Sequence, residues 1–435
     1  MMKSDKIIAV ISLGCDKNRV DTETMLYRLI KGGYSITDNY GDADVIIINT
    51  CAFISSAQKE AVDTVFEANK LRQGKLKKLV VTGCLAQRHK EKLAELLPEV
   101  DCFVGMNDYD KICEIIESDT KFVLSGHKPC DTSRRTLSTP PHYSYLKIAE
   151  GCDNHCTYCT IPSIRGHYRS GEMQSLADEA KFLSDSGVKE LIIVAQDTTR
   201  YGIDLYGEYK LTKLLKNILK TCDFVHIRLL YCYPELVSDE LIDLVASEPR
   251  MAGYMDIPLQ HISDNVLKRM GRKSNRADIV RLFDKLASRG IKVRTTFIVG
   301  FPGESEEDFG ELCDFVEKYK PYHVGIFAYS KEDGTPAAKL KGQLPTSVKR
   351  DRVNVLGERH SINTVQRNEK LIGQVLPVLY EDIDFDKNMF VGRTEYDAPE
   401  IDGLVYFTGN NCEVGSTYRV RITGYSGYDL IGEQL

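Results

Sequence analysis

Gly151-Cys152-Asp153-Asn154-His155-Cys156-Thr157-Tyr158-Cys159 is the stretch around which the chain is organised. Its cysteines have the spacing C-x3-C-x2-C, which places three thiolates within one short loop. Thiolates are the usual ligands of iron–sulfur centres, and a four-iron centre held by only three of them keeps one iron open. The spacing therefore predicts a metal centre that performs chemistry, not a closed structural site.

The composition is that of a soluble globular protein with several domains. The chain has 435 residues, of which 42% are hydrophobic and 28% charged, and its net charge is −6 at pH 7. This length favours two to four domains, and the charge gives no sign of general nucleic-acid binding. Thirteen cysteines without a convincing secretory signal favour metal or redox use over disulfides. Since no apolar run is long enough to span a membrane, we expect a cytoplasmic protein.

Residues 1–118 alternate short apolar runs with helical patterns. The apolar runs are Ile7–Ile11, Val45–Ile48 and Leu79–Val81. Helices are expected over Asp21–Lys31, Ala57–Arg72 and Gln87–Leu97. Continuous apolar strands separated by helices are typical of a parallel sheet covered on both faces. The pattern predicts an N-terminal flavodoxin-like α/β domain.

A cysteine follows each of these three apolar runs. They are Cys15, Cys51 and Cys84. The carboxyl ends of parallel strands share one edge of a sheet, so three thiolates far apart in sequence can meet there. This predicts a second three-cysteine site, assembled by the fold. Three unrelated buried thiols are the alternative.

The middle of the chain predicts a partial barrel. Residues 119–141 are polar and turn-rich, which favours a linker. Across residues 142–370, six apolar runs alternate with helical patterns, as in a TIM-like (β/α)6 barrel that is not closed to eight. The cysteine loop follows the first run, so we expect it at the mouth of the barrel. Gln196 and Gln260 follow later runs, although each alone is ordinary loop chemistry.

Residues 371–435 contain five short strand patterns with Gly and Asn turns, which favours a small all-β, OB-like barrel. This segment has eleven acidic and four basic residues, a net charge of −7. Such a charge suits a basic protein partner better than an RNA backbone. Ordinary surface acidity is the alternative interpretation.

The cysteine loop, with Tyr158 before its last cysteine, resembles the radical S-adenosylmethionine (SAM) signature. Together with the three upstream cysteines and the terminal β-barrel, a TRAM domain, the whole chain resembles the methylthiotransferase family. Several further stretches are most similar to the ribosomal-protein branch of that family, the RimO type. They are Ser12–Asn18, Glu150–Cys152, Asp256–His261 and Gly392–Gly403. Asp16 stands where that branch often has proline.

The resemblance implies two 4Fe–4S clusters and SAM as cofactors. Cys152, Cys156 and Cys159 would hold the cluster that binds SAM through its open iron. An auxiliary cluster, which would carry the sulfur, would be held by Cys15, Cys51 and Cys84. The resemblance also implies four residues that contact SAM or line the mouth of the barrel: Tyr158, Gln196, Asp256 and Gln260.

The implied reaction is methylthiolation of an aspartate β-carbon in small-subunit ribosomal protein twelve, with an electron donor such as a flavodoxin-type reductant. A sister branch with the same six cysteines instead modifies an adenosine beside the tRNA anticodon. The acidic terminal segment disfavours that RNA substrate. A third possibility is a non-catalytic iron–sulfur or zinc scaffold, although zinc prefers four closed ligands.

Overall fold

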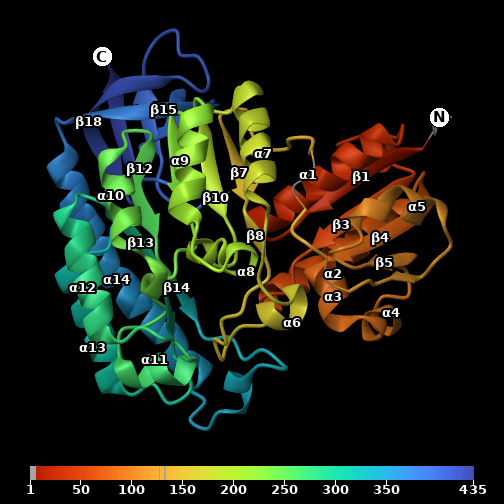
Figure 1. Ribbon diagram of the computed structural model, residues 1–435, viewed down its shortest axis with the longest axis horizontal. Coiled ribbons are helices and arrows are strands. Elements are labelled where there is room, and N and C mark those ends of the chain that lie inside the picture. Colours follow the sequence, from red (N-terminus) through yellow and green to blue (C-terminus); the bar gives the residue numbers. More distant parts are fainter. Residues whose placement is uncertain (1–5, 127, 132–133) are drawn as a thin grey trace.

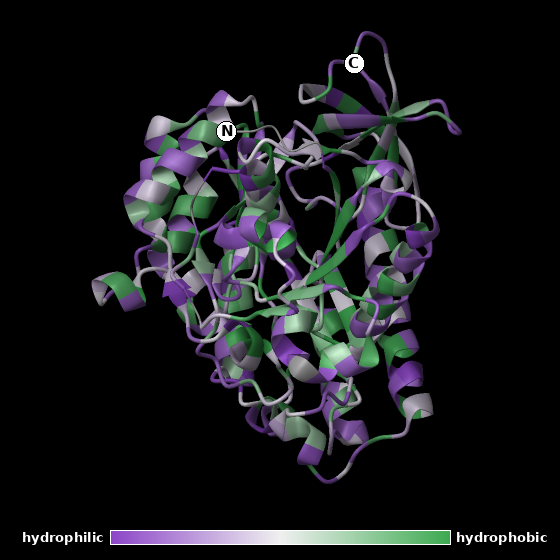
Figure 2. Ribbon diagram, turned by 90° about the vertical axis from the view of Figure 1, so that its right-hand side faces the viewer, coloured by the Kyte–Doolittle hydropathy of each residue, from purple (hydrophilic) through white to green (hydrophobic). Residues whose placement is uncertain are grey.

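The computed structural model describes residues 6–126, 128–131 and 134–435, and it shows three parts, each built on its own sheet (Figure 1). Two parallel six-stranded sheets form the N-terminal and central parts, and a closed five-stranded barrel ends the chain. Figure 2 shows apolar strands in the interior and helices whose outward faces are hydrophilic. The predicted fold class is confirmed in all three parts.

The first sheet has the strand order β2-β1-β3-β4-β5-β6, and every pairing in it is parallel. Its first five strands have the order of flavodoxin-like folds. The strands are β1 (Ile7–Ser12), β2 (Ser35–Ile36), β3 (Val45–Thr50), β4 (Lys78–Gly83), β5 (Cys102–Val104) and β6 (Phe122–Val123). The last strand lies within 119–141, where we expected a linker. Residues 127, 132 and 133 of that range lie outside the described residues.

Two helices of this part differ from the sequence-based expectation. The helices are α1 (Asp16–Lys31), α2 (Ser55–Lys70), α3 (Cys84–His89), α4 (Glu91–Leu96) and α5 (Ile112–Glu117). α1 begins directly after Cys15, five residues earlier than expected. The single helix expected over Gln87–Leu97 is wrong, because Lys90 has a φ of +47° and interrupts it. The N-termini of α1 and α3 therefore lie at Cys15 and Cys84.

The central sheet has the order β14-β13-β12-β11-β10-β7, again all parallel, with β7 and β14 at its two edges. Its strands are β7 (Tyr143–Lys147), β10 (Glu190–Val194), β11 (His226–Leu229), β12 (Met251–Asp256), β13 (Lys292–Val299) and β14 (His323–Ala328). A two-stranded hairpin, β8 (Ala149–Glu150) with β9 (Arg169–Ser170), frames the cysteine loop. The architecture is therefore an open (β/α)6 barrel.

Helices cover the outer face of this barrel (Figure 1). They are α7 (Met173–Asp185), α9 (Leu211–Thr221), α10 (Asp239–Ser247), α12 (Arg276–Ser288) and α13 (Glu306–Tyr319). Three shorter helices lie in loops that follow strands, namely α6 (Ile161–Arg165), which contacts α3 of the first part, α8 (Ile203–Tyr206) and α11 (Asp264–Met270). The inner face is partly filled by the first domain, because Val20 of α1 packs with Tyr145, Ile192 and Tyr254 in one buried cluster. The N-terminal and central parts therefore share apolar core.

The helix α14 (Thr346–Leu371) leads into the terminal barrel, whose strand order is β15-β16-β17-β19-β18. Its strands are β15 (Val375–Asp384), β16 (Met389–Arg393), β17 (Val405–Thr408), β18 (Thr417–Ser426) and β19 (Asp429–Gln434). The connection between β16 and β17 enters the central barrel at the starts of its strands. There Asp402 accepts hydrogen bonds from Tyr254 (2.8 Å) and Arg294 (3.2 Å). This end of the barrel is thereby covered, and the opposite end is the mouth.

No helix among the described residues is long and apolar enough to cross a membrane.

Candidate active site

The C-x3-C-x2-C loop leaves the short strand β8 at Gly151, whose φ is +80°. A Cβ atom at this position would lie 2.1 Å from the carbonyl oxygen of His167, so only glycine fits. The loop then directs backbone N–H groups at two of its own sulfurs: Asn154 at Cys152 Sγ and Ile161 at Cys159 Sγ, each at 3.4 Å. Such N–H groups stabilise negative charge on sulfur, as iron–sulfur ligands require.

The third sulfur of the loop, Cys156 Sγ, faces side chains from the barrel. Arg272 Nη1 lies 3.8 Å from it and the Tyr233 hydroxyl 3.9 Å. The Arg272 guanidinium also stacks over the Tyr233 ring, with 4.4 Å between Cζ and the ring centroid. Burial raises the pKa of Cys152 to about 11 and that of Cys159 to about 12. The thiols therefore need a strongly cationic partner, such as an iron centre, to ionise at neutral pH.

The structure also brings Cys15, Cys51 and Cys84 to one edge of the first sheet. Cys15 directly precedes α1, Cys51 follows β3, and Cys84 is the first residue of α3. The chain passes so close to Cys51 that a Cβ on Gly14 would lie 2.7 Å from its Cβ and 3.2 Å from its Sγ. Burial raises the pKa of Cys84 to about 12, and the nearby Cys51 and Cys15 add to this. The convergence predicted from the strand ends is thus present.

One buried amide contacts the segments that carry these three cysteines. Asn18, on α1, is 1% exposed. Its Nδ2 donates to the carbonyl oxygens of Leu13 and Thr50, both at 3.0 Å, and its Oδ1 lies 3.9 Å from Cys84 Sγ. Asn18 therefore fixes the spacing of the three segments.

Arg165 links this second site to the cysteine loop. It ends α6, six residues after Cys159, and is 2% exposed. Its Nη2 donates to Asn18 Oδ1 at 2.6 Å and lies 3.7 Å from Cys84 Sγ, while its Nη1 donates to Glu150 Oε1 at 2.7 Å. One guanidinium thus contacts groups of both cysteine sites.

The charge of Arg165 belongs to a buried network of two cations and two carboxylates. Lys147 forms ion pairs with Asp21 and with Glu150, the latter at 2.9 Å, and Arg165 pairs with the same two carboxylates. Burial alone would raise the pKa of Glu150, but Arg165 and Lys147 outweigh it and hold this pKa below its usual range. The network joins α1 to β7 and β8, so it fixes the first domain against the barrel.

The remaining predicted residues lie near the mouth of the barrel with different surroundings. Gln196 donates to Glu150 Oε1 at 3.2 Å, and its own buried oxygen has no hydrogen-bond partner in the described part of the chain. Tyr158 packs edge-on against Phe301, with ring centroids 6.4 Å apart. Gln260 has a φ of +73°. An open acceptor and a strained backbone are features expected at a ligand site.

Asp256 is already engaged by other protein groups. It accepts hydrogen bonds from Arg294 at 3.1 Å and from the backbone N–H of Tyr231 at 3.0 Å. Burial raises its pKa, and Arg294 opposes that change. Asp256 therefore links β12 to β13 and to the segment after β11, and its role at the mouth of the barrel stays a prediction.

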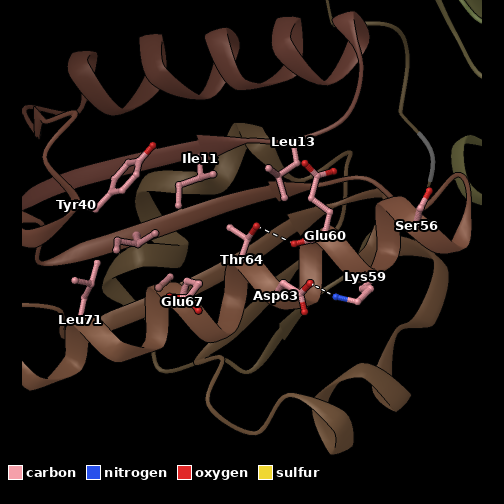
Figure 3. Close-up of a pocket in the computed structure, with 12 residues that line it drawn as sticks. Ile11, Leu13, Tyr40, Ser56, Lys59, Glu60, Asp63, Thr64, Glu67 and Leu71 are labelled. Atoms are coloured by element: carbon pink, nitrogen blue, oxygen red, sulfur yellow. Dashed lines mark hydrogen bonds and ion pairs between the residues drawn. The ribbon is translucent and has the colours of Figure 1, made fainter.

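Two further observations bear on ligand binding. Among the described residues, no three His, Cys, Asp or Glu side chains lie close enough together to hold one metal ion. A separate groove of about 600 Å³ lies between β1 and α2, lined by Ile11, Leu13 and Glu60 among others (Figure 3). None of the six predicted cysteines lines it. The cysteine sites are therefore distinct from this groove.

Three family models match successive parts of the chain. They are "Uncharacterized protein family UPF0004" over residues 7–105, "Radical SAM superfamily" over 146–316 and "TRAM domain" over 372–435. Proteins named "Ribosomal protein uS12 methylthiotransferase RimO" are similar over nearly their whole length. The one from Clostridium tetani is 46% identical, covering 97% of each chain, and the one from Lachnoclostridium phytofermentans is 46% identical, covering 98% of this chain and 99% of that one.

The chain belongs to the RimO family of radical SAM methylthiotransferases. Membership in the radical SAM superfamily implies a 4Fe–4S cluster and SAM as cofactors. Solved structures support the fold of this family member. Residues of the radical SAM methyltransferase TsrM from Kitasatospora setae superpose with a TM-score of 0.57 at 15% identity, covering 77% of each chain. The cobalamin-dependent enzyme OxsB gives a TM-score of 0.52 at 13% identity, covering 81% of this chain and 56% of that one.

Sequence reasoning missed the residues that join the two cysteine sites. Arg165 and Asn18 belong to no metal-ligand pattern, and their partners lie up to 147 residues away. One local signal was available: Arg165 is a single charge at the end of the apolar segment Ile161–Ile164, directly after the cysteine loop. Its partners, however, depend on the fold.

Proposed function

We propose that this enzyme methylthiolates the β-carbon of an aspartate in ribosomal protein uS12. The observation that carries the proposal is the 46% identity to uS12 methylthiotransferases over 97% of the chain, across all three parts in the same order. Because the substrate is a ribosomal protein, we place the reaction in the cytoplasm. The domain limits that we propose are 1–118, 142–370 and 371–435.

We assign Cys152, Cys156 and Cys159 to the SAM-binding cluster. The loop fits this group because two of its sulfurs accept backbone N–H groups and the third faces Arg272. Tyr158, Gln196 and Gln260 would contact SAM, and the open oxygen of Gln196 supports this placement. When bound, the cluster and SAM supply the one-electron chemistry that breaks an unactivated C–H bond, which acid–base groups cannot reach.

We assign Cys15, Cys51 and Cys84 to an auxiliary 4Fe–4S cluster that supplies the sulfur. The fit is supported by the glycine at position 14, where any side chain would collide with Cys51. It is also supported by the position of the site, because Arg165 contacts Cys84 and the base of the SAM loop at once. Arg165 and Glu150 therefore hold the two cysteine sites at a fixed separation, with the substrate entering between them.

The terminal barrel is the proposed contact for the basic uS12 protein, but less of its charge is available than the sequence suggests. Five of its eleven acids are engaged with the rest of the protein or with Arg393. They are Glu381, Glu395, Asp397, Glu400 and Asp402. Arg393 is itself buried, so the remaining six acids and three bases leave a net charge of −3. This surface should therefore speed the association of a basic partner only modestly, and added salt should reduce the effect.

The experiment that tests the function is mass spectrometry of uS12 from a strain that lacks this gene. We expect the methylthio group on the target aspartate to be absent and to return when the gene is restored. The reconstituted enzyme with SAM and a flavodoxin-type reductant should add the group to purified uS12. Retention of the modified aspartate in the deletion strain, or loss of a methylthio-adenosine from its tRNA, would contradict the proposal.

A further inference from the structure

A buried lysine lies between the second cysteine site and the mouth of the barrel. Lys17 is the second residue of α1, two residues after Cys15, and its side chain is 8% exposed. Its Nζ lies 3.2 Å from the centroid of the Tyr231 ring. Tyr231 follows β11 at the mouth, where its backbone N–H donates to Asp256. The ammonium group is therefore at the junction where a substrate must reach both cysteine sites.

Among the described residues, Lys17 has fewer hydrogen-bond acceptors around it than its ammonium group can use. In the described part of the chain its only partner carboxylate is that of Asp16, at 2.9 Å. The Asp16 side chain is 6% exposed, yet its Oδ2 has no hydrogen-bond partner there. The α1 N-terminus beside this pair has no side-chain cap, since Cys15 makes none. The Lys17 ammonium has three N–H groups and one carboxylate partner within the described ranges, so this buried place has donors left over, which points to a ligand that accepts hydrogen bonds.

The backbone of Tyr231, beside Lys17, is strained. Its φ is +60°, a left-handed conformation that is strained for a residue other than glycine. The strained backbone directs the ring beneath Lys17, and the hydroxyl donates to Asp16 Oδ1 at 3.3 Å. Strain of this kind persists where the surrounding structure requires one side-chain position.

Other cations near the junction pair with carboxylates other than Asp16. These are Arg165 and Lys147 with Asp21 and Glu150, Arg294 with Asp256 and Asp402, and Arg200 with Asp197. Arg272 contacts Cys156, the Tyr233 ring and the carbonyl of Pro258. Lys17, by contrast, has one carboxylate partner among the described residues for three N–H groups, so it has donors left for an incoming anion.

We propose that Lys17 binds the side-chain carboxylate of the substrate aspartate and selects aspartate over neutral side chains. This inference rests on the proposed function, in which the target residue is an aspartate. A charge-assisted hydrogen bond suits the task, because the Lys17 ammonium has N–H groups beyond the one that faces Asp16, and a carboxylate accepts from them more strongly than a neutral side chain does. It also holds the β-carbon, which adjoins the carboxylate, at a fixed place between the two cysteine sites.

The test measures binding of uS12 to the reconstituted enzyme without reductant, so that no turnover occurs. Wild-type enzyme should bind uS12 about 30-fold or more tightly than uS12 whose target aspartate is replaced by asparagine, the lower range for a buried charged contact. Lys17→Met should abolish this preference, and Lys17→Arg should retain most of it. Lys31→Met is the matched control, because Lys31 is an exposed lysine on the same helix that also lies over a tyrosine ring, at 5.9 Å.

Iron content and the electron paramagnetic resonance spectrum of each variant show whether its clusters are intact. Equal affinity of the wild-type enzyme for the two forms of uS12 would overturn the proposal, whatever the variants do. An undiminished aspartate preference in Lys17→Met would also overturn it. Failure of the wild-type enzyme to modify uS12 at all would instead overturn the proposed function, so the two failures are distinguishable.

Discussion

The two cysteine sites differ in how they are built. Cys152, Cys156 and Cys159 lie within eight residues of one loop, whereas Cys15, Cys51 and Cys84 come from three strand ends spread over 70 residues. The first site needs little more than a glycine and two backbone N–H groups to take shape. The second needs a complete parallel sheet and the amide of Asn18. The comparison shows that the loop site, on Cys152, Cys156 and Cys159, is shaped by its own short segment. The assembled site, on Cys15, Cys51 and Cys84, depends on the rest of the fold.

The largest effect should come from removing either set of thiolates. The wild-type protein should contain about eight irons, four from each cluster. Changing Cys152, Cys156 and Cys159 together to alanine should remove about half of this iron, and so should the same change at Cys15, Cys51 and Cys84. Each triple variant should lose methylthiolation entirely. Iron and sulfide analysis under anaerobic conditions checks both.

Zinc in place of iron would refute the two-cluster arrangement, and so would iron that survives both triple changes. Cys222→Ala is a suitable control, because this buried cysteine lies in the apolar core of the barrel, outside both sites.

Arg165 tests whether the two sites are joined as the structure indicates. Arg165→Met should destabilise the protein by about 3–5 kcal/mol, because Asp21 and Glu150 would then share one buried cation. Chemical denaturation of the apoprotein measures this change. The neighbouring Arg169 is the control, since its hydrogen bonds go to backbone carbonyls, and Arg169→Met should cost about 1 kcal/mol. Equal losses for the two variants would argue against a joining role for Arg165.

The opposite end of the central barrel offers a contrast with the mouth, because Glu190 there pairs with Arg228 of the central part and Arg393 of the terminal barrel. Burial alone would raise the pKa of Glu190, but Arg228 and Arg393 outweigh it and lower this pKa to about 2. The folded-state pKa is below the unfolded value, so the stability from this group is full above about pH 4.5. It should be lost as pH falls toward 2, by about 3 kcal/mol in all.

Denaturation curves measured between pH 6 and 3 should therefore show a smaller loss of stability in Glu190→Gln than in the wild-type protein. Glu240→Gln is the control, because its ion pair with Lys216 is largely exposed. A wild-type pH dependence in the Glu190 variant would place the responsible carboxylate elsewhere.

The smallest expected effect comes from adding one methyl group at Gly14, where the backbone passes close to Cys51. Gly14→Ala combines a left-handed φ of +93° with a Cβ 2.7 Å from Cys51 Cβ, whereas Gly187→Ala has a φ of +92° in open space. The backbone strain of about 1–2 kcal/mol is common to both variants. Only Gly14→Ala should also lose iron from the auxiliary cluster, and iron analysis of the pair measures this. Loss of iron in both variants, or in neither, would show that the close approach is unimportant.

Much of the fold was predictable because its signals are local. The apolar runs Val45–Ile48 and Leu79–Val81, which form β3 and β4, are recognisable from their composition alone. The start of α1 was missed because Asp16 to Val20 carry three charged residues and little apolar periodicity, and the helix there is stabilised by packing on the barrel. The interruption at Lys90 was missed because a single positive φ in a lysine has no compositional signal.

The sequence by itself determined the local cysteine loop, the order of the three parts and the positions of the six thiols relative to predicted strands. These follow from spacing and periodicity, which short segments carry on their own. Only the tertiary structure decided that Arg165 lies between the two sites, that Lys17 lies over Tyr231, and that five acids of the terminal barrel are engaged by other groups of the protein. Those contacts join residues far apart in the chain, and a charge does not specify its partner until folding brings the two together.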